Sequence, residues 1–244
     1  MSLRFTVNGQ PEDWQVAPGE TLLEALRAHD VKGPKLVCGT GDCSACGVVL
    51  DGQSVNSCCV LALQAQDRSV LTVEGLATAD GTLHPLQQAF CDAGAAQCGF
   101  CTPGMLMRSH AFLEELAGRI PSEDEVVQAL SGNYCRCTGY VKVVEAVVAA
   151  ARGALSLPSP AAGEGSVGAG LPRADARILV TGAPAYASDF SMPGMLHAKI
   201  LHSPHAHARV LRIDATEARA LSGVRAVITH QDVPGIPHCT AGQA

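Results

Sequence analysis

Apolar and polar residues alternate at the start of the chain, and this alternation predicts a small β-sheet. Residues 3–7 (Leu-Arg-Phe-Thr-Val) follow the period of two that is typical of a half-buried strand. The next two residues, Asn8 and Gly9, are a strong signal for a tight hairpin turn, which places a return strand at about residues 15–16. Further strands are expected at residues 48–50 and 53–56, which flank Asp51-Gly52, and at residues 69–73.

One helix is expected between these hairpins. Thr21 can be its N-cap, and Glu24, three residues later, completes a capping box. Leucines in its first turns supply an apolar face. A glycine-rich loop, residues 38–47, follows the helix. One helix that crosses a mixed sheet beside such a loop predicts a β-grasp arrangement over residues 1–76.

The pattern changes at about residue 77, where four consecutive helices are expected. They cover approximately residues 84–92, 102–118, 122–132 and 139–152. Thr102 is expected to be the N-cap of the second helix and Ser122 that of the third, whereas Gly132 is expected to follow the third helix as its C′ residue. Short connections favour antiparallel packing, so residues 77–155 are predicted to form a small four-helix bundle.

Residues 156–172 are rich in Gly, Pro, Ala and Ser, and this composition predicts a linker. The region beyond it, residues 173–244, mixes strand and helix patterns. Its expected elements are strands at 194–201, 208–214 and 223–229 and a short helix at 216–221. No closing element follows, so we interpret this region as the beginning of a domain. The expected fold class of the chain is α+β.

Composition and charge exclude some classes of function. The chain has 244 residues and a formal net charge of −6, which argues against a nucleic-acid partner. It contains no run of about 20 apolar residues, so no membrane span is expected. Its N-terminus lacks the apolar core of a signal peptide and a twin arginine, which predicts a cytoplasmic protein. That compartment keeps thiols reduced, which disfavours disulfides among the 11 cysteines.

Most of the cysteines form two sets of four. The first is Cys38-x4-Cys43-x2-Cys46, followed by Cys58 or its neighbour Cys59, and its first three members have the spacing of plant-type [2Fe–2S] ferredoxins. Glycines in this loop let backbone N–H groups approach the anionic sulfur atoms. Adjacent residues of a strand point in opposite directions, so only one of the last two cysteines should bind iron, and the spacing does not decide which. A zinc site or a disulfide pair is the alternative.

The second set pairs Cys98-x2-Cys101 with Cys135-x-Cys137. This spacing is less specific, because by itself it also fits a zinc site or, for the first pair, a redox dithiol. Each pair precedes an expected helix, whose N-terminus would face an anionic cluster. Two iron–sulfur clusters on one chain would let electrons enter at one cluster and leave at the other.

Two of these motifs are distinctive beyond their spacing: residues 97–104 (Gln-Cys-Gly-Phe-Cys-Thr-Pro-Gly) and residues 132–140 (Gly-Asn-Tyr-Cys-Arg-Cys-Thr-Gly-Tyr). Together with residues 55–58 (Val-Asn-Ser-Cys), they resemble the molybdenum hydroxylases, the xanthine dehydrogenase and aldehyde oxidoreductase family. The resemblance implies a plant-type [2Fe–2S] ferredoxin domain followed by a helical [2Fe–2S] domain, and it selects Cys58 as the fourth ligand of the first cluster. Ser44 departs from the family, which usually has Gly there.

The resemblance continues beyond the predicted linker. Residues 181–190 (Thr-Gly-Ala-Pro-Ala-Tyr-Ala-Ser-Asp-Phe) and 202–209 (His-Ser-Pro-His-Ala-His-Ala-Arg) are similar to the start of the family's molybdenum-binding subunit. Residues 173–244 are therefore expected to be the N-terminal part of an α/β hammerhead domain. No flavin domain lies between the two parts, an order that resembles the fused aldehyde oxidoreductase layout.

The resemblance also implies a role for each cysteine set. The cluster distal to molybdenum would be bound by Cys38, Cys43, Cys46 and Cys58, and the proximal cluster by Cys98, Cys101, Cys135 and Cys137. Gln97 and Cys137 match positions that contact the molybdopterin cofactor in the family. The catalytic glutamate and the pterin-binding loops have no counterpart in these residues, so no catalytic residue is assigned and the chain alone is not expected to be catalytic.

The implied function is electron transfer within a molybdenum-dependent oxidoreductase. In this family a molybdenum centre hydroxylates an aldehyde, a purine or a related N-heterocycle, and the electrons leave through the proximal and then the distal cluster. The expected partners are a molybdenum-binding catalytic portion or subunit, and a flavin subunit or an external electron acceptor. The alternative from another class is a stand-alone ferredoxin-like carrier or a zinc-stabilised interaction protein.

Several cysteines and histidines, which are common metal ligands, lie outside the two sets. Of the remaining cysteines, Cys59 and Cys91 are expected to be buried free thiols, and Cys239 has no set to join. Three histidines, His202, His205 and His207, could suggest a metal site. We interpret them instead as a segment whose side chains face a partner domain or solvent.

Overall fold

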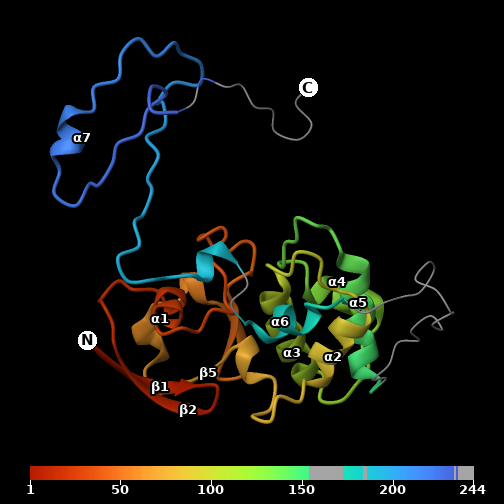
Figure 1. Cartoon of the computed structure of the whole chain (residues 1–244). Coiled ribbons are helices and arrows are strands. Elements are labelled where there is room, and N and C mark those ends of the chain that lie inside the picture. The colour runs from red at the N-terminus through yellow and green to blue at the C-terminus, as the bar shows by residue number, and fades with distance from the viewer. Residues whose placement is uncertain (154–172, 184–185, 234, 236–244) are drawn as a thin grey trace. The chain divides into compact units, whose positions relative to one another are not determined.

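The computed structural model describes residues 1–153, 173–183, 186–233 and 235 (Figure 1). The chain divides into two compact units, Met1–Ser191 and Met192–Ala244. The predicted linker at residues 156–172 lies outside the described residues. None of the described helices is long and apolar enough to cross a lipid bilayer.

A single sheet and six helices organise the described residues of the first unit. The strands are β1 (Ser2–Val7), β2 (Gln10–Gln15), β3 (Gly47–Leu50), β4 (Gln53–Asn56) and β5 (Ser69–Leu71). The helices are α1 (Leu22–Ala28), α2 (Pro85–Asp92), α3 (Thr102–Glu115), α4 (Glu123–Ala129), α5 (Tyr140–Ala151) and α6 (Ala176–Thr181). The 3-10 turns are η1 (Ser57–Cys59), η2 (Ala62–Ala65), η3 (Val73–Gly75) and η4 (Ala187–Asp189).

The sheet has the strand order β2-β1-β5-β3-β4. Each hairpin is antiparallel, and β5 joins them by pairing parallel to β1 and antiparallel to β3. Helix α1 covers the sheet, and its Leu22 and Leu26 share a buried core with Leu3 and Phe5 of β1. This is the mixed sheet with one crossing helix that the sequence predicts.

Both hairpin turns use residues that tolerate positive φ. The φ angles are 51° at Asn8 and 78° at Gly9, and 47° at Asp51 and 82° at Gly52. Two consecutive left-handed residues are what a type I′ turn requires, and Asn, Asp and Gly adopt them at least cost. The turn chemistry therefore sets the register of both hairpins.

Helix α1 begins with the predicted capping box. The Thr21 hydroxyl accepts a hydrogen bond of 3.2 Å from the Glu24 backbone N–H, and the Glu24 carboxylate accepts one of 2.8 Å from the Thr21 backbone N–H. The Thr21 N–H holds the pKa of the Glu24 carboxyl below its usual value. The cap fixes where the helix starts, and the helix in turn leads the chain into the first cysteine loop.

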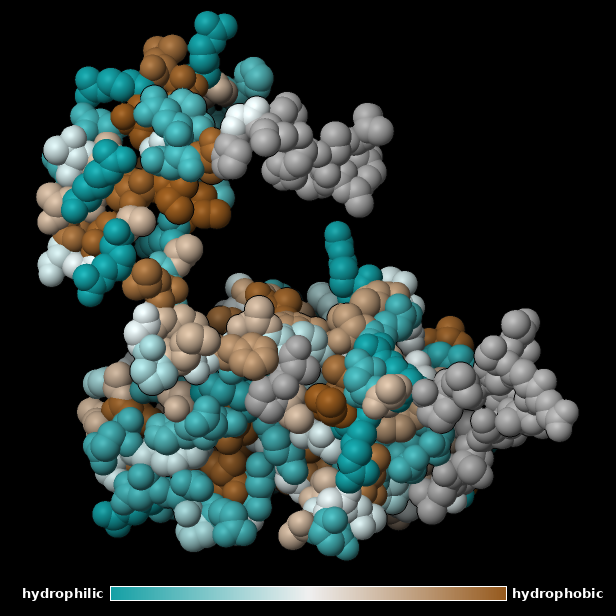
Figure 2. Space-filling model, viewed as in Figure 1, coloured by the Kyte–Doolittle hydropathy of each residue, from teal (hydrophilic) through white to brown (hydrophobic). Residues whose placement is uncertain are grey.

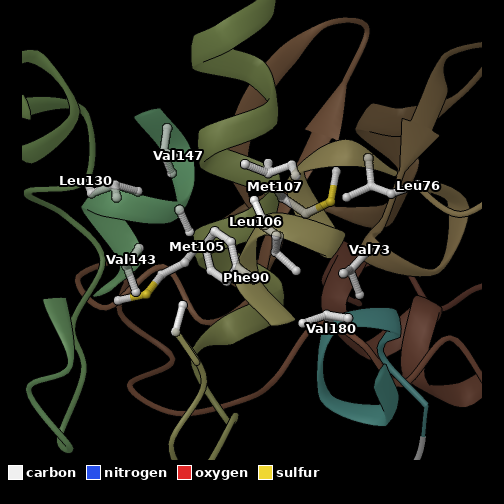
Figure 3. Close-up of a cluster of buried hydrophobic side chains, with 14 of the residues drawn as sticks. Val73, Leu76, Phe90, Met105, Leu106, Met107, Leu130, Val143, Val147 and Val180 are labelled. Carbon is white, nitrogen blue, oxygen red and sulfur yellow. The ribbon is translucent and has the colours of Figure 1, made fainter. Parts of the chain in front are cut away.

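The four helices predicted after residue 77 are present as α2–α5, and they share one buried core. Figure 3 shows the centre of this core, with Met105 of α3 directed toward Val143 of α5 and Met107 directed toward Leu76. The side chain of Phe90 from α2 lies between them (Figure 3). Helix α3 is thus the central element of the helical part.

Two helix ends differ from the prediction. Cys101 occupies the N-cap of α3, although its side chain accepts no cap hydrogen bond, and Thr102, which is buried, is the first residue of the helix instead of its cap. Helix α4 ends at Ala129 with Leu130 as C-cap, so Gly132 is not its C′ residue. The Asn133 N–H donates to the Leu130 carbonyl at 2.8 Å, which closes a turn that needs no left-handed residue at Gly132.

The sheet and the helices share buried side chains. Helix α3 packs against β3, and Val49 of β3 belongs to the same buried cluster as the helical side chains. Leu71 of β5 packs against that cluster as well. The cysteine loop before β3 and the N-terminus of α3 are therefore held next to each other.

Residues 173–191 also belong to the first unit. Helix α6 packs against α2 and α3, and Figure 3 shows its Val180 beside Val73. The buried Gln87 side-chain amide donates hydrogen bonds to the carbonyl oxygens of Val180, at 2.9 Å, and Val73, at 3.2 Å. The sequence placed these residues with the third region, whereas the structure places them against the iron–sulfur part.

In the second unit, the described residues contain one helix, α7 (Thr216–Ala220), within the predicted range, and no strand. The prediction of strands at 194–201, 208–214 and 223–229 is therefore wrong for this structure. A strand needs a paired neighbour and a buried face. Leu201 and Leu211 are instead 99% and 87% exposed, and Figure 2 shows apolar surface on this unit.

Candidate iron–sulfur sites

The first cysteine loop lies between α1 and β3. Gly39 and Gly41 adopt φ angles of 68° and 84°, and Ser44 is also left-handed, with φ 53°. A left-handed conformation costs a residue with a side chain more than it costs glycine, which is a physical reason to favour Gly at the Ser44 position. The Thr40 backbone N–H approaches the Cys38 sulfur at 3.4 Å. The loop thus presents backbone donors to sulfur, as the glycine pattern predicts.

The thiols of the first set are neighbours in two pairs. Hydrogen bonds from Thr40, and then from Cys43, lower the pKa of Cys38 to about 5. Burial raises the pKa of Cys58, and its neighbour Cys46 is the next cause. The structure therefore brings Cys38 to Cys43 and Cys46 to Cys58.

Cys58 and Cys59 share the 3-10 turn η1, and their sulfur atoms are 3.7 Å apart. They do not lie on a strand, so the expectation that they point in opposite directions is wrong. Cys59 is exposed rather than buried, and a Cβ at Gly41 would lie 2.9 Å from its sulfur. Of the two thiols, Cys58 is the more buried and is the one that contacts Cys46.

All four cysteines of the second set line one small cavity, together with Gln97. Burial is the main cause that raises the pKa of Cys98, followed by contact with Cys137. Burial likewise raises the pKa of Cys101, followed by the nearby Cys135. This set also consists of two pairs of neighbouring thiols.

Helix N-termini surround this cavity, as the sequence predicts. Cys101 is the N-cap of α3 and Gly139 is the N-cap of α5. Burial raises the pKa of Cys135, but hydrogen bonds led by the Gly139 backbone N–H outweigh it, and the pKa is lowered overall. The Cys135 backbone N–H donates to the Tyr140 hydroxyl at 2.7 Å, which holds the loop against α5. Positive helix ends favour negative charge on these sulfur atoms.

The cysteine geometry bears on the zinc alternative. Among residues 1–153, 173–183 and 186–233, no three His, Cys, Asp or Glu side chains converge as a site for a single metal ion. His202, His205 and His207 are exposed, and they form no such group either. A [2Fe–2S] cluster needs two thiolates at each of two irons, and two pairs of thiols per set fit that requirement.

The two cysteine loops touch each other. The Tyr134 backbone N–H donates a hydrogen bond of 3.1 Å to the Cys43 carbonyl oxygen. A Cβ at Gly104, in the first turns of α3, would overlap the Ser44 carbonyl oxygen. Only glycine at this position lets the first loop approach the helix that follows Cys101.

Three family models match consecutive parts of the chain. A 2Fe-2S iron-sulfur cluster binding domain matches residues 5–77, and a [2Fe-2S] binding domain matches residues 72–148. The a/b hammerhead domain of aldehyde oxidase and xanthine dehydrogenase matches residues 181–243.

Known proteins resemble the chain over the same regions. The nicotinate dehydrogenase small FeS subunit of Eubacterium barkeri is 40% identical over 148 residues, which are 60% of this chain and 92% of that subunit. The chain belongs to the molybdenum hydroxylase family. Aldehyde oxidoreductase of Megalodesulfovibrio gigas is 37% identical over 95% of this chain. The crystal structure of the aldehyde oxidoreductase from Desulfovibrio desulfuricans matches 96% of the chain, with a TM-score of 0.84 and 38% identity.

This molybdenum hydroxylase chain carries the [2Fe–2S] portion of the family, fused to the start of the molybdenum-binding portion. It spans 27% of the length of each of the two aldehyde oxidoreductases. Two [2Fe–2S] clusters belong to the matched portion, and the aldehyde oxidoreductases of the family use molybdopterin. The predicted family, the fusion and the two clusters are confirmed.

Sequence reasoning missed the residues that cover the second cysteine set of this hydroxylase chain. The Tyr186 hydroxyl donates to the Cys98 carbonyl oxygen at 2.7 Å. Burial raises the pKa of Tyr186 to about 12. The buried ammonium of Lys35 donates to the Asp189 carboxylate at 2.8 Å, and although burial lowers the pKa of Lys35, Asp189 opposes that shift. Tyr186 and Asp189 lie in the 181–190 motif, which indicated the family but not these contacts.

Proposed function

We propose that this chain conducts electrons, one at a time, between a molybdopterin centre and a flavin or another external acceptor. The contact between the two cysteine loops carries this proposal. Cys135 follows Tyr134, whose N–H is bonded to the Cys43 carbonyl, so one hydrogen bond links the backbones of the two sets. A short path of covalent bonds and one hydrogen bond supports electron transfer between the sets.

Each cysteine set is proposed to hold one [2Fe–2S] cluster. The proposed ligands are Cys38, Cys43, Cys46 and Cys58 for the first cluster and Cys98, Cys101, Cys135 and Cys137 for the second. The two thiol pairs of each set would supply two thiolates to each iron. When bound, such a cluster accepts and releases a single electron, with plant-type clusters near about −400 mV.

The second set is proposed to lie nearer to the molybdopterin. Gln97 and Cys137, the proposed contacts to this cofactor, line the same cavity. A Cβ at Gly139 would lie 3.0 Å from the Gln97 side-chain nitrogen, so the loop packs closely on Gln97. Tyr134 and Val141, which flank this set, are 59% and 70% exposed, which supports a docking surface for a partner.

The complete enzyme is proposed to hydroxylate an aldehyde, a purine or an N-heterocycle. Its proposed partners are a molybdenum-binding catalytic portion or subunit, and a flavin subunit or external acceptor. Residues 77–155 would form the four-helix [2Fe–2S] bundle, and residues 173–244 would begin the hammerhead domain. The names of two matched relatives, an aldehyde oxidoreductase and a nicotinate dehydrogenase subunit, support the aldehyde and the N-heterocycle in this range.

The proposal is tested by the spectra of the anaerobically prepared full chain. We expect a coloured protein that contains iron and sulfide and that gives two distinct [2Fe–2S] EPR signals after reduction with dithionite. A colourless protein that contains zinc would contradict the proposal and favour the interaction-protein alternative. A single [2Fe–2S] signal would contradict the proposed two-cluster pathway and favour a stand-alone ferredoxin-like carrier.

A further inference from the structure

Residues 173–183 and 186–191, hereafter the covering segment, lie across the iron–sulfur part. At one end, the Arg173 guanidinium donates hydrogen bonds to the carbonyl oxygens of the two residues that precede Cys98. These are Gln97 and Ala96, and the bond to Ala96 is 3.2 Å long. In the middle, a Cβ at Gly182 would lie 2.5 Å from a methyl carbon of Val73, so the Gly182 backbone is in close contact with the Val73 side chain. The covering segment is therefore packed against the loop that begins the second cysteine set.

The other end is anchored by buried charges. Asp189 accepts hydrogen bonds from Lys35 at 2.8 Å and from Arg27 at 3.0 Å, both of which belong to the sheet-containing part. The Lys35 side chain is 1% exposed and the Asp189 side chain is fully buried. A buried charge that loses its partner is strongly unfavourable, so this pair fixes the position of the segment.

Tyr186 lies between these two anchors and contacts the Cys98 loop. Its hydroxyl donates to the Cys98 carbonyl at 2.7 Å, and its ring packs edge-on against Phe100 with centroids 4.8 Å apart. A Cβ at Gly99 would lie 2.7 Å from the same hydroxyl oxygen. The Lys35 ammonium lies 4.9 Å from the centre of the Tyr186 ring, so the anchor pair directly contacts this side chain.

We propose that Tyr186 is a positioning residue for the second [2Fe–2S] cluster, held in place by the Lys35–Asp189 pair. The inference rests on the proposed role of Cys98 as a ligand. The hydroxyl donates to the Cys98 carbonyl oxygen, and this bond restrains the Cys98–Gly99 peptide and draws electron density away from the loop. Hydrogen bonding and solvent exposure set the reduction potential of such clusters. Because reduction adds negative charge, loss of this donor disfavours the reduced form of the second cluster alone.

The test is a redox titration of the full chain, followed by EPR, with Tyr186→Phe. The variant keeps the ring and removes only the hydroxyl. We expect reduction of the second cluster to become two- to tenfold less favourable, a decrease in potential of up to about 59 mV for one electron. The potential of the first cluster should not change. Ser188→Ala is the matched control, because Ser188 is exposed and contacts Arg27 only through its backbone carbonyl among the described contacts.

A second variant, Asp189→Asn, keeps the shape of the side chain and removes its charge. It should shift the second cluster in the same direction, and the double variant should shift it by less than the sum, because both changes act through Tyr186. Unchanged potentials in Tyr186→Phe, or equal shifts of both clusters, would overturn the inference. Absence of two signals in the wild-type chain would instead contradict the proposed function, so the two failures are distinguishable.

Discussion

The backbone amide of Tyr134 donates a hydrogen bond of 3.1 Å to the carbonyl oxygen of Cys43. This bond joins the loop of the first cysteine set to the residue that precedes Cys135 of the second. It forms because α3 packs against β3 and because Gly104 leaves room for the Ser44 carbonyl. The spacing of the two proposed clusters therefore depends on a glycine that is not itself a ligand.

Substitution of Gly104 by alanine should disturb the contact between the loops. The added methyl group would overlap the Ser44 carbonyl oxygen and lie 3.1 Å from the Ala45 Cα, so either the loop or the helix must move. We expect a lower iron content and an altered EPR signal of the first cluster. The control is Gly19→Ala, which meets no atom within 4 Å at a position without positive φ. Identical spectra for Gly104→Ala and the wild type would show that the contact tolerates a methyl group.

Cys58 and Cys59 can be separated by single substitutions. Because Cys58 contacts Cys46 and Cys59 is exposed, Cys58→Ser should abolish one of the two EPR signals, whereas Cys59→Ser should preserve both. Iron analysis of both variants provides an independent measure of the lost cluster. Loss of a signal in Cys59→Ser, with both signals retained in Cys58→Ser, would reverse the assignment of the fourth ligand.

The helical core should depend on Leu106 of α3. This side chain is fully buried, so Leu106→Ala should lower the free energy of unfolding by about 2–5 kcal/mol through lost burial and the cavity that remains. Ile120→Ala, at a side chain that is 50% exposed, should change it by about 0.5 kcal/mol or less. Anaerobic urea unfolding of the cluster-loaded chain measures both. Equal effects of the two substitutions would contradict the packing described for α3.

Stability should fall in mildly acidic solution because of two histidines. Burial lowers the pKa of His84 and of His110, whose rings lie edge to face with centroids 5.4 Å apart. Burial therefore favours the neutral form of both rings in the folded chain, and their contribution to stability is complete above the unfolded pKa of 6.5 and is lost as the pH falls through the lower folded values. The negative charge of Glu114 opposes both shifts.

The histidine prediction is measured by urea unfolding at about pH 7.5 and pH 5.5, on either side of the ordinary histidine pKa. His110→Gln should lose less stability between these two pH values than the wild type does. His197→Gln, at an exposed position of the second unit, should behave like the wild type. A pH dependence that is unchanged in His110→Gln would assign the acid sensitivity to other groups.

Local chemistry made much of the first unit predictable. Asn8-Gly9 and the Thr21 capping box act within a few residues, and the cysteine spacings reflect the geometry that a cluster imposes on its loop. The N-cap of α3 was predicted one residue too late, at Thr102. The observed N-cap, Cys101, makes no side-chain cap hydrogen bond, so it lacks the polar signal on which the prediction relied. The strands expected after residue 194 were not found, since alternation alone cannot supply the neighbour that a strand needs.

The contacts of residues 173–191 could not be predicted, because they join residues 76 to 162 positions apart in sequence. Nothing in the sequence around Lys35 distinguishes it from a surface lysine, and its burial becomes evident only from its ion pair with Asp189. Tyr186 likewise carries no sign in the sequence that its hydroxyl meets the Cys98 carbonyl. Such pairings depend on tertiary packing, which residue patterns near each partner do not encode.

The packing of residues 173–191 changes where this chain should be divided for study. A fragment that ends at residue 155, where the composition changes, would bury the Lys35 ammonium without the Asp189 carboxylate and deprive Gln87 of the Val180 carbonyl. Removal of one partner of a buried ion pair typically costs about 3–5 kcal/mol. A fragment that ends after Ser191 keeps both contacts. The folding unit of the iron–sulfur part is thus longer than its cysteine motifs indicate, and it includes residues 173–191, which follow the predicted linker.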